Sequence, residues 1–199
     1  ADPVRAIVIT GAGTAFCAGA DLSGGVYNSE FIDAHASMLR TVESVPVPVI
    51  AAVNGPAIGA GVQLALAADL RVVVPGAVFA VPVVKVGLAL DNWTIKRLAN
   101  VVGGGHARSV LMTARPVGAE EAARIGLANE IGDLDTAMEL AAELTQFAPL
   151  SLRHIKTVIN DDDARLLPRD EQTELQKRAW NSEDMAEARA AREENRPPV

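Results

Sequence analysis

The sequence has few of the residues from which metal sites, disulfides and nucleic-acid surfaces are built. Its 199 residues include one cysteine, Cys17, and three histidines, so neither an internal disulfide nor a metal cluster with soft ligands can be assembled. Lysine and arginine number 18 against 25 aspartates and glutamates, and the net charge of −7 gives no footprint for a nucleic-acid backbone. We therefore expect no metal and no nucleic-acid partner, and the lone cysteine favours a reducing cytoplasm.

The one long uncharged run, residues 44–68, exceeds the roughly 20 residues that a bilayer span needs. Three prolines, Asn54 and Gln63 interrupt it, which favours a buried strand, a turn and a buried helix over a membrane span. With 49% hydrophobic and 22% charged residues, the chain has the composition of one globular domain with a sizeable core.

Strand and helix patterns alternate along the first half of the chain. Short apolar runs predict strands, and helical spacing of apolar residues predicts helices. The expected strands are 5–10, 49–53 and 70–74, with a further extended stretch at 79–84, and the expected helices are 30–43 and 59–68. After Asp91 we expect helices near 91–101, 105–114, 118–125, 134–147, 149–160 and 170–194. The alternation predicts an α/β fold with a mainly parallel sheet.

Two stretches of small residues, 17–21 and 58–61, each follow an expected buried strand. Small residues leave backbone N–H groups accessible, and two such groups that converge on a carbonyl form an oxyanion hole able to stabilise an enolate. The second stretch also opens a helix, whose dipole adds positive potential. A dinucleotide turn at residues 11–13 is not expected, because Phe16 stands where its third glycine would be.

The sequences AFCAGADL (15–22) and PVIAAVNGPAIGAGVQLALAADLRV (48–72) resemble the two signature regions of the enoyl-CoA hydratase/isomerase family, also called the crotonase family. The resemblance continues through ARPVGAEEAARIGLANEIG (114–132) and SEDMAEARAAREENRPP (182–198). It implies a ββα spiral whose C-terminal helices build a homotrimer or a dimer of trimers. It also implies that acyl-CoA thioesters bind as ligand or substrate, without another cofactor.

By the same resemblance, residues 1–148 form the spiral core and residues 149–199 a C-terminal helical extension of one domain. The further βαβ-like unit that family members carry before the strand at Arg5, with its R-P-x-x-x-N-A sequence, is missing from the residues present.

The resemblance implies particular roles for the small residues. The oxyanion donors would be the backbone N–H groups of Ala20 and Ala60, where alanine replaces the usual glycine. The coenzyme A moiety would lie along Ala18, Gly19, Ala20, Asp21 and Leu22, with Asp21 orienting the loop.

Both glutamates that a hydratase of this family uses are replaced. Gln63 stands at the first position, in the helix after the second small-residue stretch, and Val83 at the second, in a P-E-x-x-x-G sequence. Neither side chain can exchange a proton, so ordinary hydration is not expected. Asp91 resembles the reactive aspartate of other branches, and it could equally cap the helix that follows it.

Two hypotheses follow. In the first, the protein binds fatty acyl-CoA without hydrating it. In the second, it is an enzyme that uses Asp91 as acid or base for another acyl-CoA reaction, such as double-bond isomerisation. Because Gln63 and Val83 replace both glutamates, the first hypothesis, binding without hydration, is favoured.

Overall fold

The computed structural model describes residues 4–21, 29–161, 174, 177–178 and 180–196. Within it the chain divides into two compact units. The first contains residues 1–80 and 117–162, and the second contains residues 81–116 and 163–199. The division at residue 148 expected from the family stays a prediction.

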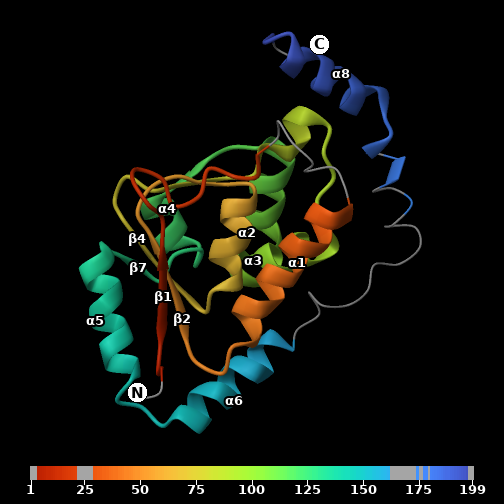
Figure 1. Ribbon diagram of the computed structural model, residues 1–199. Helices are drawn as coiled ribbons and strands as arrows, with labels where there is room; N and C mark the ends of the chain where they lie inside the picture. Colours follow the sequence, from red (N-terminus) through yellow and green to blue (C-terminus); the bar gives the residue numbers. More distant parts are fainter. Residues whose placement is uncertain (1–3, 22–28, 162–173, 175–176, 179, 197–199) are drawn as a thin grey trace. The chain divides into compact units, whose positions relative to one another are not determined.

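A parallel sheet of four strands forms the centre of the first unit (Figure 1). Its strands, in spatial order, are β1 (Ile7–Thr10), β2 (Val49–Val53), β4 (Leu70–Val73) and β7 (Glu130–Ile131). In register, Ile7 pairs with Val49, and Val72 pairs with Glu130. The mainly parallel sheet expected from the sequence is confirmed.

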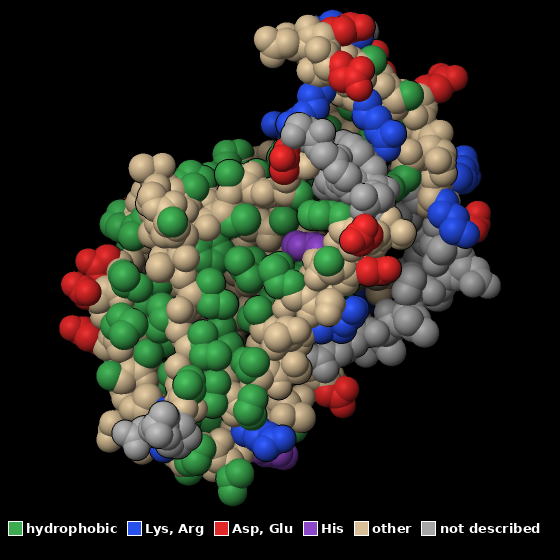
Figure 2. Space-filling view, viewed as in Figure 1, with side chains coloured by type: hydrophobic (Ala, Val, Ile, Leu, Met, Phe, Trp, Pro, Cys, Tyr) green, Lys and Arg blue, Asp and Glu red, His purple; other side chains and the backbone are tan. Residues whose placement is uncertain are grey.

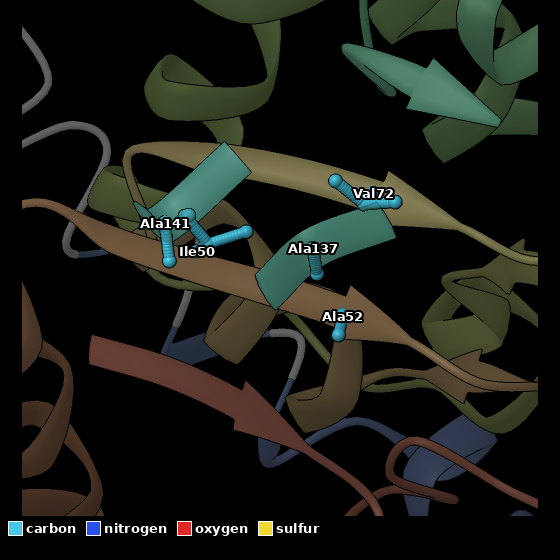
Figure 3. Close-up of a cluster of buried hydrophobic side chains, with 5 residues drawn as sticks. All are labelled: Ile50, Ala52, Val72, Ala137 and Ala141. Atoms are coloured by element: carbon cyan, nitrogen blue, oxygen red, sulfur yellow. The ribbon is translucent and has the colours of Figure 1, made fainter. Parts of the chain in front are cut away.

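Both faces of this sheet are covered by helices. All five residues of β2 are buried, as a strand packed on two sides requires. Helix α5 (Leu134–Leu144) lies on one face, with α2 (Ala60–Ala67) and α1 (Ser29–Ser44) on the other (Figure 1). Two alanines of α5 pack against β2 and β4 in a core cluster (Figure 3). The cluster comprises Ile50, Ala52, Val72, Ala137 and Ala141.

Strand β1 is an edge of the sheet and is less covered than β2. Its residues Ile7, Val8 and Ile9 are half-buried. Figure 2, in the same view as Figure 1, shows hydrophobic side chains gathered over this part of the first unit, between α5 and α1.

A second sheet in the same unit is made of three short strands. They are β3 (Ala57–Ile58), β5 (Val78–Ala80) and β6 (Val117–Gly118), with β3 parallel and β6 antiparallel to β5. The extended stretch expected at 79–84 is therefore wrong beyond Ala80. Residues Pro82–Val86 form a 3₁₀ helix, η1. Pro82 favours the start of this helix, because its φ is fixed near the helical value and it has no N–H group that would lack a partner there.

The remaining helices are α4 (Ala119–Arg124) and α6 (Pro149–Asn160) in the first unit, and α3 (Asn92–Thr113) and α8 (Glu183–Glu193) in the second. Helix α3 is broken at Gly103, with φ 76° and ψ 152°, which agrees with the two helices expected there. Most of the helix expected before residue 180 lies outside the described residues. Within the described residues, no helix is both long enough and apolar enough to cross a bilayer.

Candidate functional site

The two small-residue stretches singled out in the sequence run side by side in the first unit. The N–H groups of Phe16 and Cys17 donate to the carbonyl oxygen of Pro56, at 3.1 and 3.2 Å. Ile58 N–H in turn donates to the carbonyl oxygen of Cys17 at 2.9 Å. The structure therefore brings together two backbone segments that are about forty residues apart in the sequence.

Glycines allow the two segments to come this close. A Cβ atom on Gly61 would lie 2.2 Å from the carbonyl oxygen of Cys17, and one on Gly55 would lie 2.1 Å from that of Thr14. Gly19 has φ 106°, a conformation that side chains other than glycine rarely adopt. The backbone geometry of this region thus requires glycine at positions 19, 55 and 61.

Ala60 is the first residue of α2, where helix N–H groups have no partner within the helix. The preceding residue, Gly59, has φ 54° and offers no side-chain cap. Among the described non-glycine residues, positive φ occurs at Ala114 and Asn195, so alanine at position 60 is not strained in this way. The start of α2 therefore has the properties of an anion-stabilising helix terminus.

The other predicted contacts with coenzyme A lie on the segment that runs beside α2. Gly19 and Ala20 are half-buried, and Ala18 and Asp21 are exposed. Leu22, also predicted to contact coenzyme A, lies outside the described residues.

Gln63 lies one turn after Ala60 on α2 and is 9% exposed. His35 of α1 donates a hydrogen bond from Nε2–H to its side-chain oxygen Oε1, at 2.9 Å. The His35 ring is stacked on Phe31, with ring centroids 5.8 Å apart and an interplanar angle of 4°. Sequence reasoning missed His35 as a partner of Gln63. The spacing of Phe31, His35 and Leu39 at every fourth residue was the signal that these side chains share one helix face.

In the second unit, the position of the other replaced glutamate is apolar. Val83 lies in η1, and its carbonyl oxygen accepts a hydrogen bond from Leu88 N–H at 3.0 Å. Its side chain carries no proton to exchange, so this position cannot supply a general acid or base.

Asp91 is the N-cap of α3. Its Oδ1 accepts from Thr94 N–H at 2.9 Å, and its Oδ2 accepts from the Thr94 hydroxyl at 2.6 Å. Both carboxylate oxygens thus bond a residue whose side chain is buried in the second unit. Two roles were open for Asp91, acid or base and helix N-cap, and the structure shows the N-cap.

No described group of three or more histidines, cysteines, aspartates and glutamates is arranged to hold a metal ion. Of the predicted site residues, those described in the first unit offer backbone donors and the carboxamide of Gln63, bonded to the imidazole of His35, while Asp91 in the second unit offers a carboxylate that caps α3.

Comparisons with known proteins point to one family. A sequence profile described as enoyl-CoA hydratase/isomerase matches residues 1–199. The chain is 51% identical over 194 residues to a protein of Mycobacterium leprae named probable enoyl-CoA hydratase echA6, covering 98% of this chain and 78% of that protein.

Solved structures are also similar to this chain. The structure of a carnitinyl-CoA dehydratase from Mycobacterium avium 104 matches with a TM-score of 0.80 at 36% identity, over 100% of this chain and 82% of that one. A methylmalonyl-CoA decarboxylase matches with a TM-score of 0.89 over 98% of this chain and 80% of that one, and at 23% identity this likeness shows the fold alone.

Proposed function

Because the chain belongs to the enoyl-CoA hydratase/isomerase family, with the crotonase fold, we propose that it binds fatty acyl-CoA thioesters through a backbone oxyanion hole and does not hydrate them. The N–H groups of Ala20 and Ala60 would donate to the thioester carbonyl oxygen. The coenzyme A moiety would lie along residues 18–22.

The observation that carries this proposal is that the residues replacing the two glutamates cannot transfer protons. Hydration needs one group that takes a proton from water and one that delivers a proton to the α-carbon. At the corresponding positions the chain has Gln63, whose carboxamide does not titrate, and Val83, which is apolar. The backbone frame of the oxyanion hole needs no particular side chain, so binding can persist where proton transfer is lost.

Asp91 is the alternative source of proton transfer in an isomerase-type enzyme. Its two oxygens accept hydrogen bonds from the backbone and side chain of Thr94. To act as an acid or base, the carboxyl group would have to give up part of this cap, which costs about 1 kcal/mol of helix stability. The cap therefore favours binding without turnover.

The family resemblance also leads us to propose a homotrimer or a dimer of trimers. Exposed apolar side chains on α6, Ile155, Val158 and Ile159, support an interface on the first unit.

The decisive experiment titrates the protein with saturated acyl-CoA thioesters by calorimetry and follows the absorbance of crotonyl-CoA and longer 2-enoyl-CoA thioesters under the same conditions. We expect binding without loss of enoyl absorbance. Hydration at a rate well above the uncatalysed one would contradict the proposed lack of activity, and absence of binding would contradict the ligand class.

A matched pair of variants tests the donor at position 60. Ala60→Pro removes the N–H at the first position of α2, where proline is tolerated in helices, and Ala60→Ser keeps that N–H. We expect acyl-CoA binding to weaken about five- to tenfold in the proline variant, the contribution of one hydrogen bond, and to change little in the serine variant.

A further inference from the structure

Asn54, directly after β2, is bonded to the turn that follows β1. Its Oδ1 accepts a hydrogen bond from Gly11 N–H at 3.0 Å, and its Nδ2 donates to the carbonyl oxygens of Gly11 and Gly13, at 3.1 and 3.0 Å. These partners fix the orientation of the carboxamide, because an N–H group must face its oxygen and a carbonyl oxygen must face its amino group. One half-buried side chain thus holds both ends of the 11–13 turn.

The backbone that leads into the second small-residue stretch, residues 58–61, is anchored by β5. Ala57 of β3 pairs with Phe79, and Gly59 N–H donates to the carbonyl oxygen of Ala80 at 2.9 Å. The first stretch, residues 17–21, meets this backbone at an isolated parallel bridge between Cys17 and Ala57. A bridge of one residue pair holds its register less firmly than a ladder of several pairs, and the glycines before it add conformational freedom.

The two proposed oxyanion donors come directly after this bridge in their segments. A Cβ atom on Gly19 would lie 3.1 Å from the carbonyl oxygen of Ile58, so these two residues are in contact. Ala20 follows Gly19, and Ala60 comes two residues after Ile58. In paired extended segments, a slip of one residue turns each group to the opposite side. The register between the two stretches therefore decides whether the N–H groups of Ala20 and Ala60 face the same oxygen.

We propose that Asn54 is a positioning residue for the oxyanion hole. By holding Gly11 and Gly13, its carboxamide fixes where the first stretch begins relative to the second, and so keeps the N–H groups of Ala20 and Ala60 directed to one carbonyl oxygen. Asn54 acts through the backbone and not on the ligand. This inference rests on the proposed function, because it requires a thioester carbonyl bound by the two donors.

The test measures the stretching frequency of the thioester carbonyl in a bound saturated acyl-CoA, isotope-labelled at the carbonyl carbon, by infrared difference spectroscopy. Hydrogen bonds to the oxygen polarise the carbonyl and lower this frequency. In the wild-type protein we expect the band to lie below that of the free thioester. Because the shifted band comes from bound ligand alone, a fraction of unfolded protein does not change its position.

Asn54→Asp and Asn54→Ala disrupt these bonds in two ways. Aspartate keeps the shape and the acceptor for Gly11 N–H but turns a carboxylate oxygen toward the two carbonyl oxygens, and alanine removes all three hydrogen bonds. In both variants we expect the band to lose about half of its shift, because one of two donors is displaced. Affinity for the acyl-CoA, measured by calorimetry, should fall about fivefold, the contribution of one hydrogen bond.

Thr10→Val is the matched control, because Thr10 precedes Gly11 and its hydroxyl donates to the carbonyl oxygen of Ala52 on β2 at 2.9 Å. The substitution removes a side-chain hydrogen bond at the neighbouring position and leaves the bonds of Asn54 in place. We expect the band and the affinity to remain those of the wild-type protein.

Either Asn54 variant is sufficient for the test if the other does not fold. A wild-type band position in the Asn54 variants, or an equal displacement by Thr10→Val, would overturn the inference and leave acyl-CoA binding intact. A wild-type band at the frequency of the free thioester, or no binding by the wild-type protein, would instead overturn the proposed oxyanion hole and this inference with it.

Discussion

Gly61 lies at the contact between the two small-residue stretches, residues 17–21 and 58–61. Adding a Cβ there would place it 2.2 Å from the carbonyl oxygen of Cys17 and 3.0 Å from the Cys17 Cβ. The nearest atom belongs to the backbone and cannot rotate away, so one segment would have to move.

We predict that Gly61→Ala lowers the free energy of unfolding by about 1–3 kcal/mol, the usual cost of overpacking, although alanine is the better helix former. Acyl-CoA binding should weaken as well, because the segments that carry Ala20 and Ala60 are pushed apart. Urea unfolding and calorimetric titration measure the two effects.

Gly105→Ala is the matched control, since Gly105 is also helical but is exposed, and nothing lies within 4 Å of its added Cβ. This change should be neutral or stabilise the protein by up to about 1 kcal/mol. Equal effects of the two substitutions would show that steric contact with Cys17 is not what position 61 requires.

The candidate site could be predicted from the sequence only where it follows from residues close together in the chain. The stretches 17–21 and 58–61, and the loss of acids at Gln63 and Val83, are visible in the sequence. The hydrogen bond from His35 is not, because its partner is 28 residues away and is chosen by the packing of α1 on α2. Helical spacing gives the face on which His35 lies but not what lies opposite.

At the scale of the element, the start of α5 is held by a reciprocal cap. Asp133 Oδ1 accepts from Thr136 N–H at 3.1 Å, and Asp133 N–H donates to the Thr136 hydroxyl at 3.3 Å. The backbone hydrogen bond from Thr136 is the main cause that lowers the pKa of Asp133 below its usual 3.8.

We predict that this cap makes the stability of α5 dependent on pH in the acid range. Because the pKa is lower in the folded state, the stabilisation is fully present above the unfolded value near 3.8 and is lost as pH falls through the folded value. Asp133→Asn keeps an acceptor but does not titrate. Between pH 7 and pH 2 the wild-type protein should therefore lose more of its free energy of unfolding than the variant, by a small amount because the side chain is exposed.

Denaturant unfolding at a series of pH values measures the difference between the two proteins. Parallel pH profiles would contradict the link between the cap and the acid-range stability.

Long elements could be predicted from the sequence, and very short ones could not. Strand β2 was predicted to the residue, and α1, α2 and α6 within a residue or so of each end, since each carries a full period of apolar side chains. Strands β3, β6 and β7 have two residues each and no periodicity of their own. They are strands only because a neighbouring strand supplies their hydrogen-bond partners.

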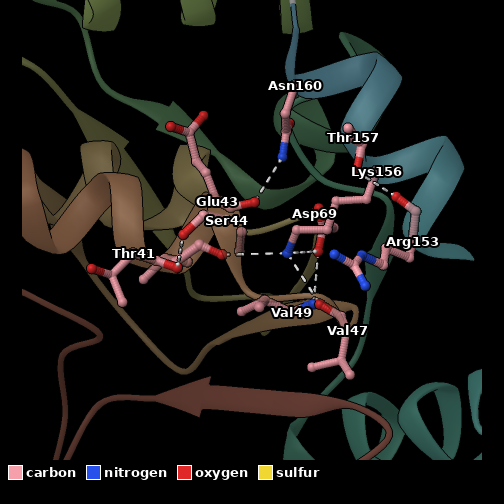
Figure 4. Close-up of polar contacts among 12 residues, drawn as sticks. Thr41, Glu43, Ser44, Val47, Val49, Asp69, Arg153, Lys156, Thr157 and Asn160 are labelled. Carbon is pink, nitrogen blue, oxygen red and sulfur yellow. Dashed lines mark hydrogen bonds and ion pairs between the residues drawn. The ribbon is translucent and has the colours of Figure 1, made fainter.

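At the scale of the whole molecule, one ammonium group joins parts of the first unit that are distant in the sequence (Figure 4). Lys156 Nζ on α6 forms an ion pair with Asp69 Oδ2 at 2.8 Å and donates to the carbonyl oxygens of Val42 and Val47, at 3.3 and 3.1 Å. Asp69 Oδ2 also accepts from Val49 N–H at 2.7 Å, at the start of β2. The end of α1, the start of β2 and α6 thus share one polar centre.

We predict that Lys156→Met destabilises the first unit by about 2–4 kcal/mol. The substitution leaves the Asp69 carboxylate without its cation, and removing one partner of a fully buried pair costs about 3–5 kcal/mol. We expect somewhat less here, because the Asp69 side chain keeps 20% of its surface exposed, against 8% for Lys156. Hydrogen exchange should rise together in β2 and α6, since both lose the same contact.

Lys177→Met is the control, because Lys177 pairs with Glu174 while 64% of each side chain is exposed. Exposed pairs of this kind contribute about 0–1 kcal/mol, so this change should leave the unfolding transition almost unmoved. High salt should reduce the difference in unfolding free energy between the wild-type protein and Lys156→Met only slightly, because screening acts weakly on buried pairs. If Lys156→Met costs no more than Lys177→Met, α6 is held to the sheet by apolar packing alone, and the polar centre around Lys156 serves only to satisfy carbonyl groups.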